Sequence, residues 1–372
     1  MTAVLFESIF HLPHDGWCTA TRSYARAMKM AGIDVQLHSW APVPLELDPG
    51  VQAEVGELLA PLKTRRDVYT FSSALGGPGR MKHPLSVLQT QYFKPRTLYT
   101  MFERTDIQPE LVAALNMLEG VWVPCSANAE VLKRCGSVNT TYIPYPYFDD
   151  DPALALPPPR KEARTFLWIG RWEPRKAPDV LLRAFLNAFK PGEAKLIMKI
   201  GPVPWERPYV VPESCLKQLL DLPVIRQQGW TLENVDRDVE FVRGKLAPAE
   251  ILELHARSDV YVSASRGEGI DLPVFASKLA GRRIVTTDSG GPRDFIGEGD
   301  VLVPSCGFVP APQYEWIWGH GCTYADYKMS DLIAALQKAR GATSKVEPMP
   351  VANRAEYMGK KLVQWLESVR GS

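Results

Sequence analysis

The chain has 372 residues, of which 45% are hydrophobic and 23% charged, a composition typical of a globular protein and not of a disordered or fibrous one. Its 43 Lys and Arg nearly balance its 42 Asp and Glu, so no overall charge attracts nucleic acid or an anionic membrane. A chain of this length usually forms two domains.

The first half alternates short apolar runs with segments of helical period, a pattern that predicts a parallel sheet flanked by helices. One expected helix has an apolar face of Tyr24, Ala27, Met28 and Ala31 and ends at Gly32. The other elements expected here are strands at Ala3–Phe6, Asp34–His38, Thr97–Phe102 and Gly120–Pro124, and a helix at Ala127–Cys135 closed by Gly136.

A proline-rich and acidic segment, Ile143–Pro159, then interrupts the pattern, because it can form neither a continuous helix nor a central strand. It is the best candidate for a linker between two α/β domains, with 149–163 as its expected core.

After the linker the α/β pattern restarts. The expected strands are Thr165–Gly170, Lys195–Ile200, Val239–Val242, Asp259–Ser265 and Arg283–Thr287, and the expected helices are Asp179–Phe189, Pro248–Arg257, Val274–Ala280 and a terminal Asn353–Arg370 with apolar positions Tyr357, Leu362, Val363, Trp365 and Leu366.

Chemistry is expected at the carboxyl ends of the second set of strands, where open α/β sheets bind ligands. The loop GRWEPRK places Arg171 and Lys176 beside a glycine, where they could neutralise a diphosphate and the charge on a leaving group. Taken alone, such a motif is more often a solvated turn of charges.

A second loop, RGEGIDLP, joins a strand to a helix that has proline near its first position. The backbone N–H groups of such a helix start form an anion site. Glu268, flanked by glycines, could accept hydrogen bonds from sugar hydroxyls, and the turn at Gly290 and Gly291 would let the backbone approach a ligand closely.

Three successive segments resemble the donor domain of glycosyltransferase family 4, the glycosyl transferases group 1, and its retaining relatives: GRWEPRKAPDVLLRAF, KLAPAEILELHARSDVYVSASRGEGIDLP and RRIVTTDSGGPRDFI. In the first half, TLYTMFERTD, GVWVPCSANAEVLKRCGS and IPYPYFD resemble that family's acceptor domain and hinge. The resemblance is weakest in residues 39–95.

The resemblance implies an α/β protein with the GT-B fold, in which two Rossmann-like domains face each other across a cleft. Residues 1–148 would bind the acceptor and 164–352 the nucleotide-sugar donor, and the terminal helix, 353–372, would pack back on the first domain.

The resemblance also assigns roles by position. Arg171 and Lys176 match the basic pair on the donor diphosphate, and Glu268 matches the first glutamate of a paired-glutamate motif that holds the donor sugar. Glu103 stands where many relatives have a residue facing the reaction centre, so these four form the expected catalytic set. The donor-binding set adds residues that approach the donor mainly through their backbone: Gly16, Gly170, Gly269, Ile270, Asp271, Leu272, Gly290 and Gly291.

Two positions depart from the family pattern. Ala276 stands where the second glutamate, which usually binds the ribose, is expected, and Asp271 stands where glycine is common. These departures bear on recognition of the nucleotide more than on sugar transfer itself.

The expected reaction is retaining transfer from a nucleotide diphosphate sugar to a hydroxyl of a glycan, a lipid-linked acceptor or a small molecule. A UDP-sugar is favoured as donor, with a GDP-sugar as the alternative and no metal or further cofactor. Front-face attack, in which the donor phosphate helps deprotonate the acceptor, needs cations and positioning more than a strong base.

Two other readings stay open: a transferase that modifies a hydroxylated DNA base, and a non-catalytic module that binds nucleotide sugars. A basic stretch could face an anionic acceptor, although a solvated face is favoured, and four tryptophans could stack on sugar, although packing is favoured. These residues are Arg65, Arg66, Arg80, Lys82 and His83, and Trp205, Trp230, Trp316 and Trp318.

The six cysteines show no CxxC spacing, which argues against a zinc site and a disulfide framework. The start of the chain reads as a buried strand and not as a signal peptide, and no apolar run is long enough to span a membrane. We expect a cytoplasmic protein, and contact with a membrane surface to reach a lipid-linked acceptor stays open.

Overall fold

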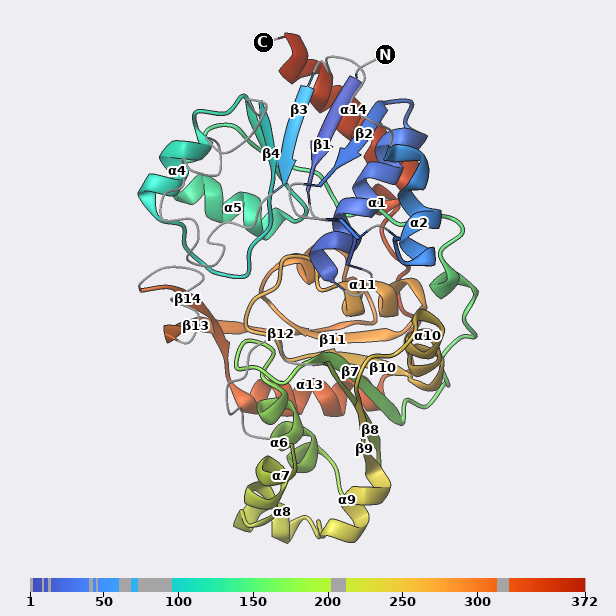
Figure 1. The fold of residues 1–372 in the computed structure, drawn as a ribbon. Helices are drawn as coiled ribbons and strands as arrows, with labels where there is room; N and C mark the ends of the chain where they lie inside the picture. The colour runs from blue at the N-terminus through green and yellow to red at the C-terminus, as the bar shows by residue number, and fades with distance from the viewer. Residues whose placement is uncertain are drawn as a thin grey trace. The chain divides into compact units, whose positions relative to one another are not determined.

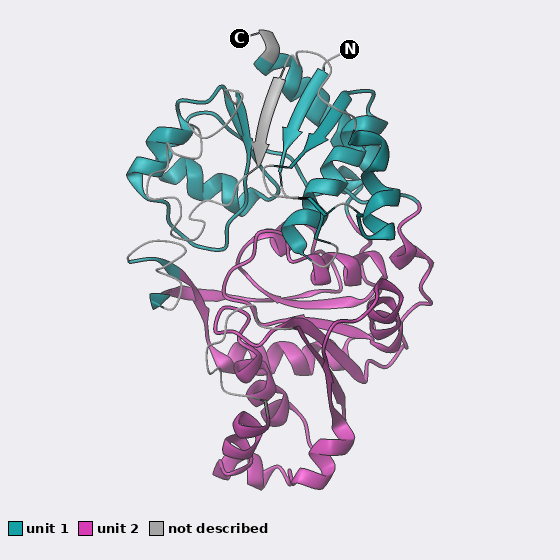
Figure 2. Ribbon diagram, viewed as in Figure 1, with its two compact units in different colours: residues 1–149, 310–323, 350–372 teal, residues 150–309, 324–349 magenta. Residues whose placement is uncertain are grey.

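The computed structural model describes residues 3–8, 10–12, 15–39, 43–44, 46–59, 68–72, 96–201, 212–312 and 321–371. The chain forms two compact units (Figure 2): unit 1 comprises Met1–Asp149, Pro310–Thr323 and Pro350–Ser372, and unit 2 comprises Asp150–Val309 and Tyr324–Met349. The basic residues Arg65, Arg66, Arg80, Lys82 and His83 and the tryptophans Trp205, Trp316 and Trp318 lie outside the described residues.

Unit 1 is built on a six-stranded sheet in the order β2-β1-β3-β4-β5-β6, and its strand pairs are parallel (Figure 1). Its strands are β1 (Ala3–Glu7), β2 (Asp34–His38), β3 (Val68–Ser72), β4 (Thr97–Tyr99), β5 (Gly120–Val123) and β6 (Thr140–Tyr142). Its helices are α1 (Gly16–Met30), α2 (Pro49–Val55), α4 (Pro109–Leu115), α5 (Ser126–Arg134) and α14 (Ala355–Gly371), with 3-10 turns η1 (Gly56–Leu58) and η5 (Val351–Asn353).

The C-terminal helix α14 completes unit 1 by packing on α1 and β5. A Cβ added at Gly359 would lie 2.9 Å from the Cβ of Ala31, and one at Gly120 would lie 2.6 Å from the Trp365 ring, so both glycines permit close packing. Leu362 and Leu366 are fully buried. Tyr357, expected on the apolar face, is 48% exposed, so that part of the helix prediction was wrong.

Unit 2 contains a parallel six-stranded sheet in the order β12-β11-β10-β7-β8-β9. Its strands are β7 (Thr165–Arg171), β8 (Lys195–Gly201), β9 (Val239–Arg243), β10 (Val260–Ser263), β11 (Arg283–Thr287) and β12 (Val301–Val303). Its helices are α6 (Pro178–Ala188), α7 (Pro212–Leu220), α8 (Pro223–Gln227), α9 (Leu232–Asp238), α10 (Pro248–Arg257), α11 (Leu272–Leu279) and α13 (Met329–Gly341), with 3-10 turns η2 (Pro152–Ala155) and η3 (Gly291–Asp294).

The strand order of unit 2 locates its ligand-binding edge. The order runs outward from β7 through β8 and β9 on one side, and from β10 through β11 and β12 on the other. In such a doubly wound sheet the crevice opens at the carboxyl ends of the two central strands, because their crossover helices leave toward opposite faces. For unit 2 this point lies between the ends of β7 and β10.

One hydrophobic cluster of unit 2 lies on one face of the sheet. Phe166 and Trp168 of β7 and Met198 of β8 pack with Phe185 of α6 and Leu336 of α13. Successive side chains of a strand alternate between faces. The intervening residues of β7 and β8 therefore point to the opposite face, which matters for the site.

The start of the unit 2 sheet is fixed by the buried carboxylate of Asp259. The guanidinium of Arg160 donates to its Oδ2 at 2.6 Å, and the backbone N–H groups of Arg164 and Thr165 each donate to the same oxygen at 2.9 Å. The segment expected as a linker is thus attached to unit 2 at its carboxyl end.

A short two-stranded sheet pairs β13 (Ser305–Pro310) with β14 (Thr323–Tyr327). Residues 310–323 group with unit 1, although the sequence placed them in the second domain.

Most predicted elements have nearly the predicted bounds, and three have the same bounds: Asp34–His38, Pro248–Arg257 and Arg283–Thr287. The strand predicted at Thr97–Phe102 ends at Tyr99. Beyond it the N–H of Phe102 donates to Oδ1 of Asn128 at 3.2 Å instead of to a neighbouring strand.

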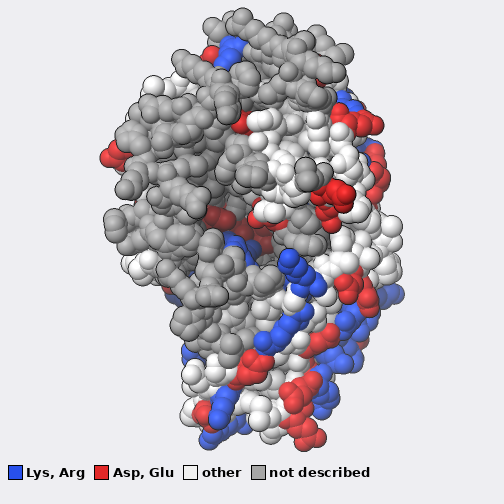
Figure 3. Space-filling model, in the orientation of Figure 1, with Lys and Arg blue, Asp and Glu red and all other residues white. Residues whose placement is uncertain are grey.

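On the face in Figure 3, basic and acidic side chains alternate over the described surface instead of gathering in one field. None of the described helices is long and apolar enough to cross a membrane. Among the described residues no cluster of His, Cys, Asp or Glu is arranged to hold a metal ion, and the six cysteines are free thiols.

Candidate functional site

The loops that follow β7 and β10 are joined by backbone hydrogen bonds at the central crevice of unit 2. The N–H of Arg266 donates to the carbonyl of Arg175 at 2.8 Å, and its guanidinium donates to the carbonyl of Pro174 at 2.9 Å. In return, the guanidinium of Arg175 donates to the carbonyl of Gly267 at 2.7 Å. The two loops therefore position one another.

The end of β7 and the tight turn after it carry three cations: Arg171, Arg175 and Lys176. The N–H groups of Lys176 and Ala177 both donate to the carbonyl of Glu173, at 3.0 and 3.2 Å, and Ala177 adopts a left-handed conformation with φ 45°. Pro178 then begins α6, since its fixed φ suits a first helical position. The buried carboxylate of Glu173 accepts a hydrogen bond from Arg175 at 3.0 Å.

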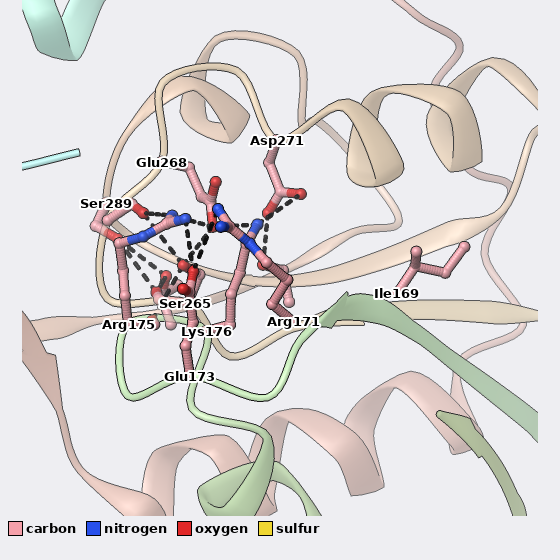
Figure 4. Close-up of polar contacts among 12 residues, drawn as sticks. Ile169, Arg171, Glu173, Arg175, Lys176, Ser265, Glu268, Asp271 and Ser289 are labelled. Carbon is pink, nitrogen blue, oxygen red and sulfur yellow. Dashed lines mark hydrogen bonds and ion pairs between the residues drawn. The ribbon is translucent and has the colours of Figure 1, made fainter. Parts of the chain in front are cut away.

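Glu268 is the centre of the site (Figure 4). Its Oε1 lies 2.6 Å from Nζ of Lys176, 2.5 Å from Oγ of Ser265 and 3.0 Å from the guanidinium of Arg175, and its side chain is 7% exposed. Burial alone would raise the pKa of this carboxyl, but the charges of Lys176 and Arg175 and the hydrogen bonds lower it to about 2. Glu268 is therefore ionised near neutral pH.

Asp271 lies beside Glu268 in an unusual backbone conformation, left-handed with φ 60°, directly before α11. Its Oδ2 accepts a hydrogen bond from Ser263 at 2.7 Å, whereas its buried Oδ1 has no hydrogen-bond partner and lies 3.9 Å from Nζ of Lys176. Burial raises the pKa of Asp271 to about 6, with Lys176 opposing the rise and Glu268 adding to it. Of these two neighbouring carboxylates, Glu268 is thus ionised and Asp271 titrates nearer to neutrality.

The glycine turn after β11 packs directly on the Glu268 loop. A Cβ at Gly290, which has φ 79°, would lie 2.1 Å from the carbonyl oxygen of Glu268, and one at Gly291 would lie 2.2 Å from that of Gly269. The hydroxyl of Thr287 donates to the carbonyl of Ser265 at 2.5 Å. Only glycine allows this approach, so the two glycines support the loop that carries Glu268.

The structure brings the predicted donor-site residues of unit 2 together on three adjoining loops. Arg171 is the most exposed of its cations, with 39% of its side chain accessible and a loose 3.8 Å pair with Glu173. Ile270 is buried, and Leu272 is the first residue of α11. Gly170 also has a packing reason, because a Cβ there would lie 2.7 Å from the ring of Trp168.

Ala276 lies within α11 and is half-buried. It offers no polar group to a ribose.

Two predicted residues belong to unit 1. Gly16 is exposed at the first position of α1, where Oδ1 of Asp15 accepts a hydrogen bond from the N–H of Cys18 at 3.0 Å. Glu103 is half-buried in the loop between β4 and α4.

Sequence reasoning missed three polar residues of the site: Arg175, Ser265 and Lys199. Arg175 stands in the basic motif but received no role, and its burial at 4% could not be foreseen. Ser265 precedes the glycine loop without any motif of its own. Lys199 could have been noticed in the sequence, since it is a cation in the interior of a largely apolar strand, KLIMKIG.

Residues 163–309 match the model of a protein family, the Glycosyl transferases group 1. A curated relative, the serotype-specific mannosyltransferase WbdA of Escherichia coli, is 27% identical over 124 residues. That stretch is 33% of this chain but only 13% of the relative, so the chain corresponds to a small part of that protein.

Solved structures resemble the chain over nearly its whole length. Alr3699/HepE from Anabaena, in complex with UDP and glucose, has a TM-score of 0.57 at 14% identity, covering 99% of this chain and 100% of its own. The lipopolysaccharide outer core galactosyltransferase WaaB has 0.60 at 13% identity, covering 99% of each chain. Sucrose-phosphate synthase from Thermosynechococcus elongatus has 0.59 at 16% identity, covering 100% of this chain and 96% of its own.

Proposed function

We propose that this chain transfers a sugar from a nucleotide diphosphate sugar to a hydroxyl acceptor. It has the GT-B fold and is similar to glycosyltransferase family 4, as its sequence predicted. The observation that carries the proposal is the cluster of Glu268 with Lys176 and Arg175 at the central crevice of unit 2, beside the start of α11. Cations and a helix N-terminus suit a diphosphate, and a carboxylate suits sugar hydroxyls.

In this proposal, Arg171 and Lys176 neutralise the diphosphate and the charge that develops on it as the sugar leaves. The first turn of α11 adds backbone N–H groups from Leu272 and Val274, but none from Pro273. Glu268 accepts hydrogen bonds from the donor sugar through lone pairs that its three donors leave unused. Gly16 and Glu103 are proposed to act from unit 1, as the resemblance implies.

We further propose that the transfer retains anomeric configuration without a covalent sugar intermediate on Glu268. Three donors already bind Oε1 of this carboxylate, and its pKa is lowered to about 2, so it is a weak nucleophile. Attack on the same face as the departing phosphate is consistent with this arrangement.

A UDP-sugar is the first donor to test, because the Anabaena protein was solved with UDP. GDP-sugars come next, including a mannose donor, because WbdA is a mannosyltransferase. A glycan, a lipid-linked molecule or a small molecule with a free hydroxyl is the proposed acceptor class.

The test is a thermal-shift and hydrolysis panel of UDP-, GDP-, ADP- and dTDP-sugars with the wild type and Glu268→Gln. One donor should stabilise the wild type selectively, because ligands that bind the folded state raise its melting temperature. The substitution should weaken that effect. NMR of the product then reads the anomeric configuration, and inversion would contradict the retaining mechanism.

Ala276 favours a second candidate, a module that binds a nucleotide sugar without turning it over, since the residue offers no ligand for the ribose. Stabilisation by a donor with no hydrolysis or transfer in the same panel would support this candidate over the enzyme.

A further inference from the structure

Lys199 lies in the interior of β8 and is 9% exposed. Its ammonium makes no hydrogen bond or ion pair with any residue in the described part of the chain. Burial lowers the pKa of this lysine, and no opposing charge restores it. Burying a charged group without a partner is unfavourable, so a lysine in this position suggests a role in binding an anion.

The register of the sheet places Lys199 next to the candidate site. Lys199 pairs with Ile169 of β7, and Gly201 pairs with Arg171. These four residues therefore share the face of the sheet opposite the hydrophobic cluster that contains Phe166 and Trp168. A Cβ added at Gly201 would lie 3.7 Å from Cγ of Arg171 and 3.8 Å from Nζ of Lys199. The ammonium and the stem of Arg171 therefore border the same space over Gly201, at the carboxyl ends of β7 and β8.

The other cations of the site are already engaged. Lys176 and Arg175 both bind Glu268, at 2.6 and 3.0 Å. Among the described residues, Arg171 has only its 3.8 Å pair with Glu173. Lys199 and Arg171 are thus the cations of this edge with the most unused capacity for an anion.

We propose that Lys199 and Arg171 together bind the diphosphate of the nucleotide donor, with Gly201 leaving the room it needs. This inference rests on the proposed function and adds β8 to the donor site. An ammonium supplies a point charge with three donors and a guanidinium supplies a planar fork, so the pair suits the several oxygens of two linked phosphates. The bound anion would supply a partner for Lys199 that the described part of the chain does not provide.

The test measures Kd by isothermal titration for UDP, GDP and ADP with the wild type, Lys199→Met and Lys195→Met. Methionine keeps most of the length of the lysine side chain and removes its charge. Lys195 is the matched control, because it is an exposed lysine at the opposite end of the same strand. Lys199→Met should raise Kd about tenfold for the diphosphate that the wild type binds best, the loss expected for a hydrogen bond to a charged group, and Lys195→Met should leave Kd unchanged.

The affinity for uridine or the matching nucleoside, measured by competition, shows whether Lys199 contacts the diphosphate or the nucleoside part of the ligand. Lys199→Met should leave nucleoside affinity unchanged, and an equal loss for nucleoside and diphosphate would place the contact on the base or ribose and overturn the inference. Unchanged diphosphate affinity in Lys199→Met also overturns it, while the proposed function stands. If the wild type binds no nucleotide, the proposed function fails and this inference with it.

Melting temperature separates a binding role from a structural one. Without ligand, Lys199→Met should melt no lower than the wild type, because it removes a buried charge that has no partner among the described residues. A clear fall in melting temperature, with the weakened binding restored by stabilising conditions, would show that Lys199 acts only through the fold.

Discussion

The carboxylate of Glu268 and the ammonium of Lys176 meet at 2.6 Å, although they come from loops that follow two different strands, β10 and β7. Only 7% and 14% of their side chains are exposed. Each charge therefore depends on the other, since neither has much water to solvate it. The pair links the two central loops of unit 2 and makes the site sensitive to a change on either side.

Removing one member of this pair should be worse than removing both. Glu268→Gln should lower the free energy of unfolding by about 3 kcal/mol, because it leaves Lys176 buried without its partner. The double variant Glu268→Gln/Lys176→Met should lose less free energy of unfolding than Glu268→Gln alone, since Arg175 keeps its contact with Glu173. Urea unfolding of the four proteins of this cycle measures the coupling, and strictly additive losses would contradict it.

Asp271 should make stability depend on pH. Its pKa is raised to about 6 from the ordinary 3.8 of an aspartate, so its contribution to stability is fully present below the lower value and is lost as pH rises through the higher one. Between pH 4 and pH 7 the free energy of unfolding of Asp271→Asn should therefore rise relative to that of the wild type, by on the order of 1–3 kcal/mol for a shift of this size. Thermal unfolding at several pH values tests this, and a difference that is constant with pH would contradict it.

Gly290→Ala should disrupt the site by pushing the backbone of Glu268 away. A Cβ would lie 2.1 Å from its carbonyl oxygen, in addition to the strain at φ 79°. Gly229→Ala is the matched control, because its φ is 87° but nothing lies within 4 Å of the added Cβ. The control should lose about 1 kcal/mol of stability, and Gly290→Ala should lose more and also lose donor binding. Equal melting temperatures and equal donor affinities in the two variants would refute the packing argument.

Asp259→Asn should destabilise unit 2 at neutral pH and have less effect in acid. Burial opposes ionisation of Asp259, but hydrogen bonds from the side chain of Arg160 and from three backbone N–H groups lower its pKa. Its contribution is therefore present above the unfolded pKa near 4 and is lost as pH falls. The variant should be less stable at pH 7 by about 3 kcal/mol, with the difference shrinking toward pH 3. Tryptophan fluorescence in urea at each pH follows this, and a difference that grows on acidification would contradict it.

The sequence was most informative where strands are buried and end in glycine or charged loops. Such runs predicted β7, β8, β10 and β11 to within two residues at each end. It was less informative for short elements such as β6 and β12, because three residues carry too little periodicity to detect.

The site was predictable as a set of loops but not as a set of contacts. Arg171, Lys176 and Glu268 could be selected because glycines and a helix start flank them. The role of Arg175 depends on which side chain of the basic loop turns inward, and its contacts there are to Glu173 and to the carbonyl of Gly267 on another loop. The raised pKa of Asp271 likewise follows from burial that no local pattern encodes.

The path of the chain through the two units has a consequence for synthesis on the ribosome. All six strands of the unit 2 sheet come from one continuous stretch, between residues 165 and 303. The first unit, in contrast, needs α14, whose Gly359 packs on Ala31 from near the other end of the chain. Although domains often fold in the order in which they emerge, the amino-terminal unit here must keep apolar surface of α1 uncovered until translation has passed through the second unit. We expect nascent chains stalled before residue 355 to be recognised by chaperones through that uncovered surface.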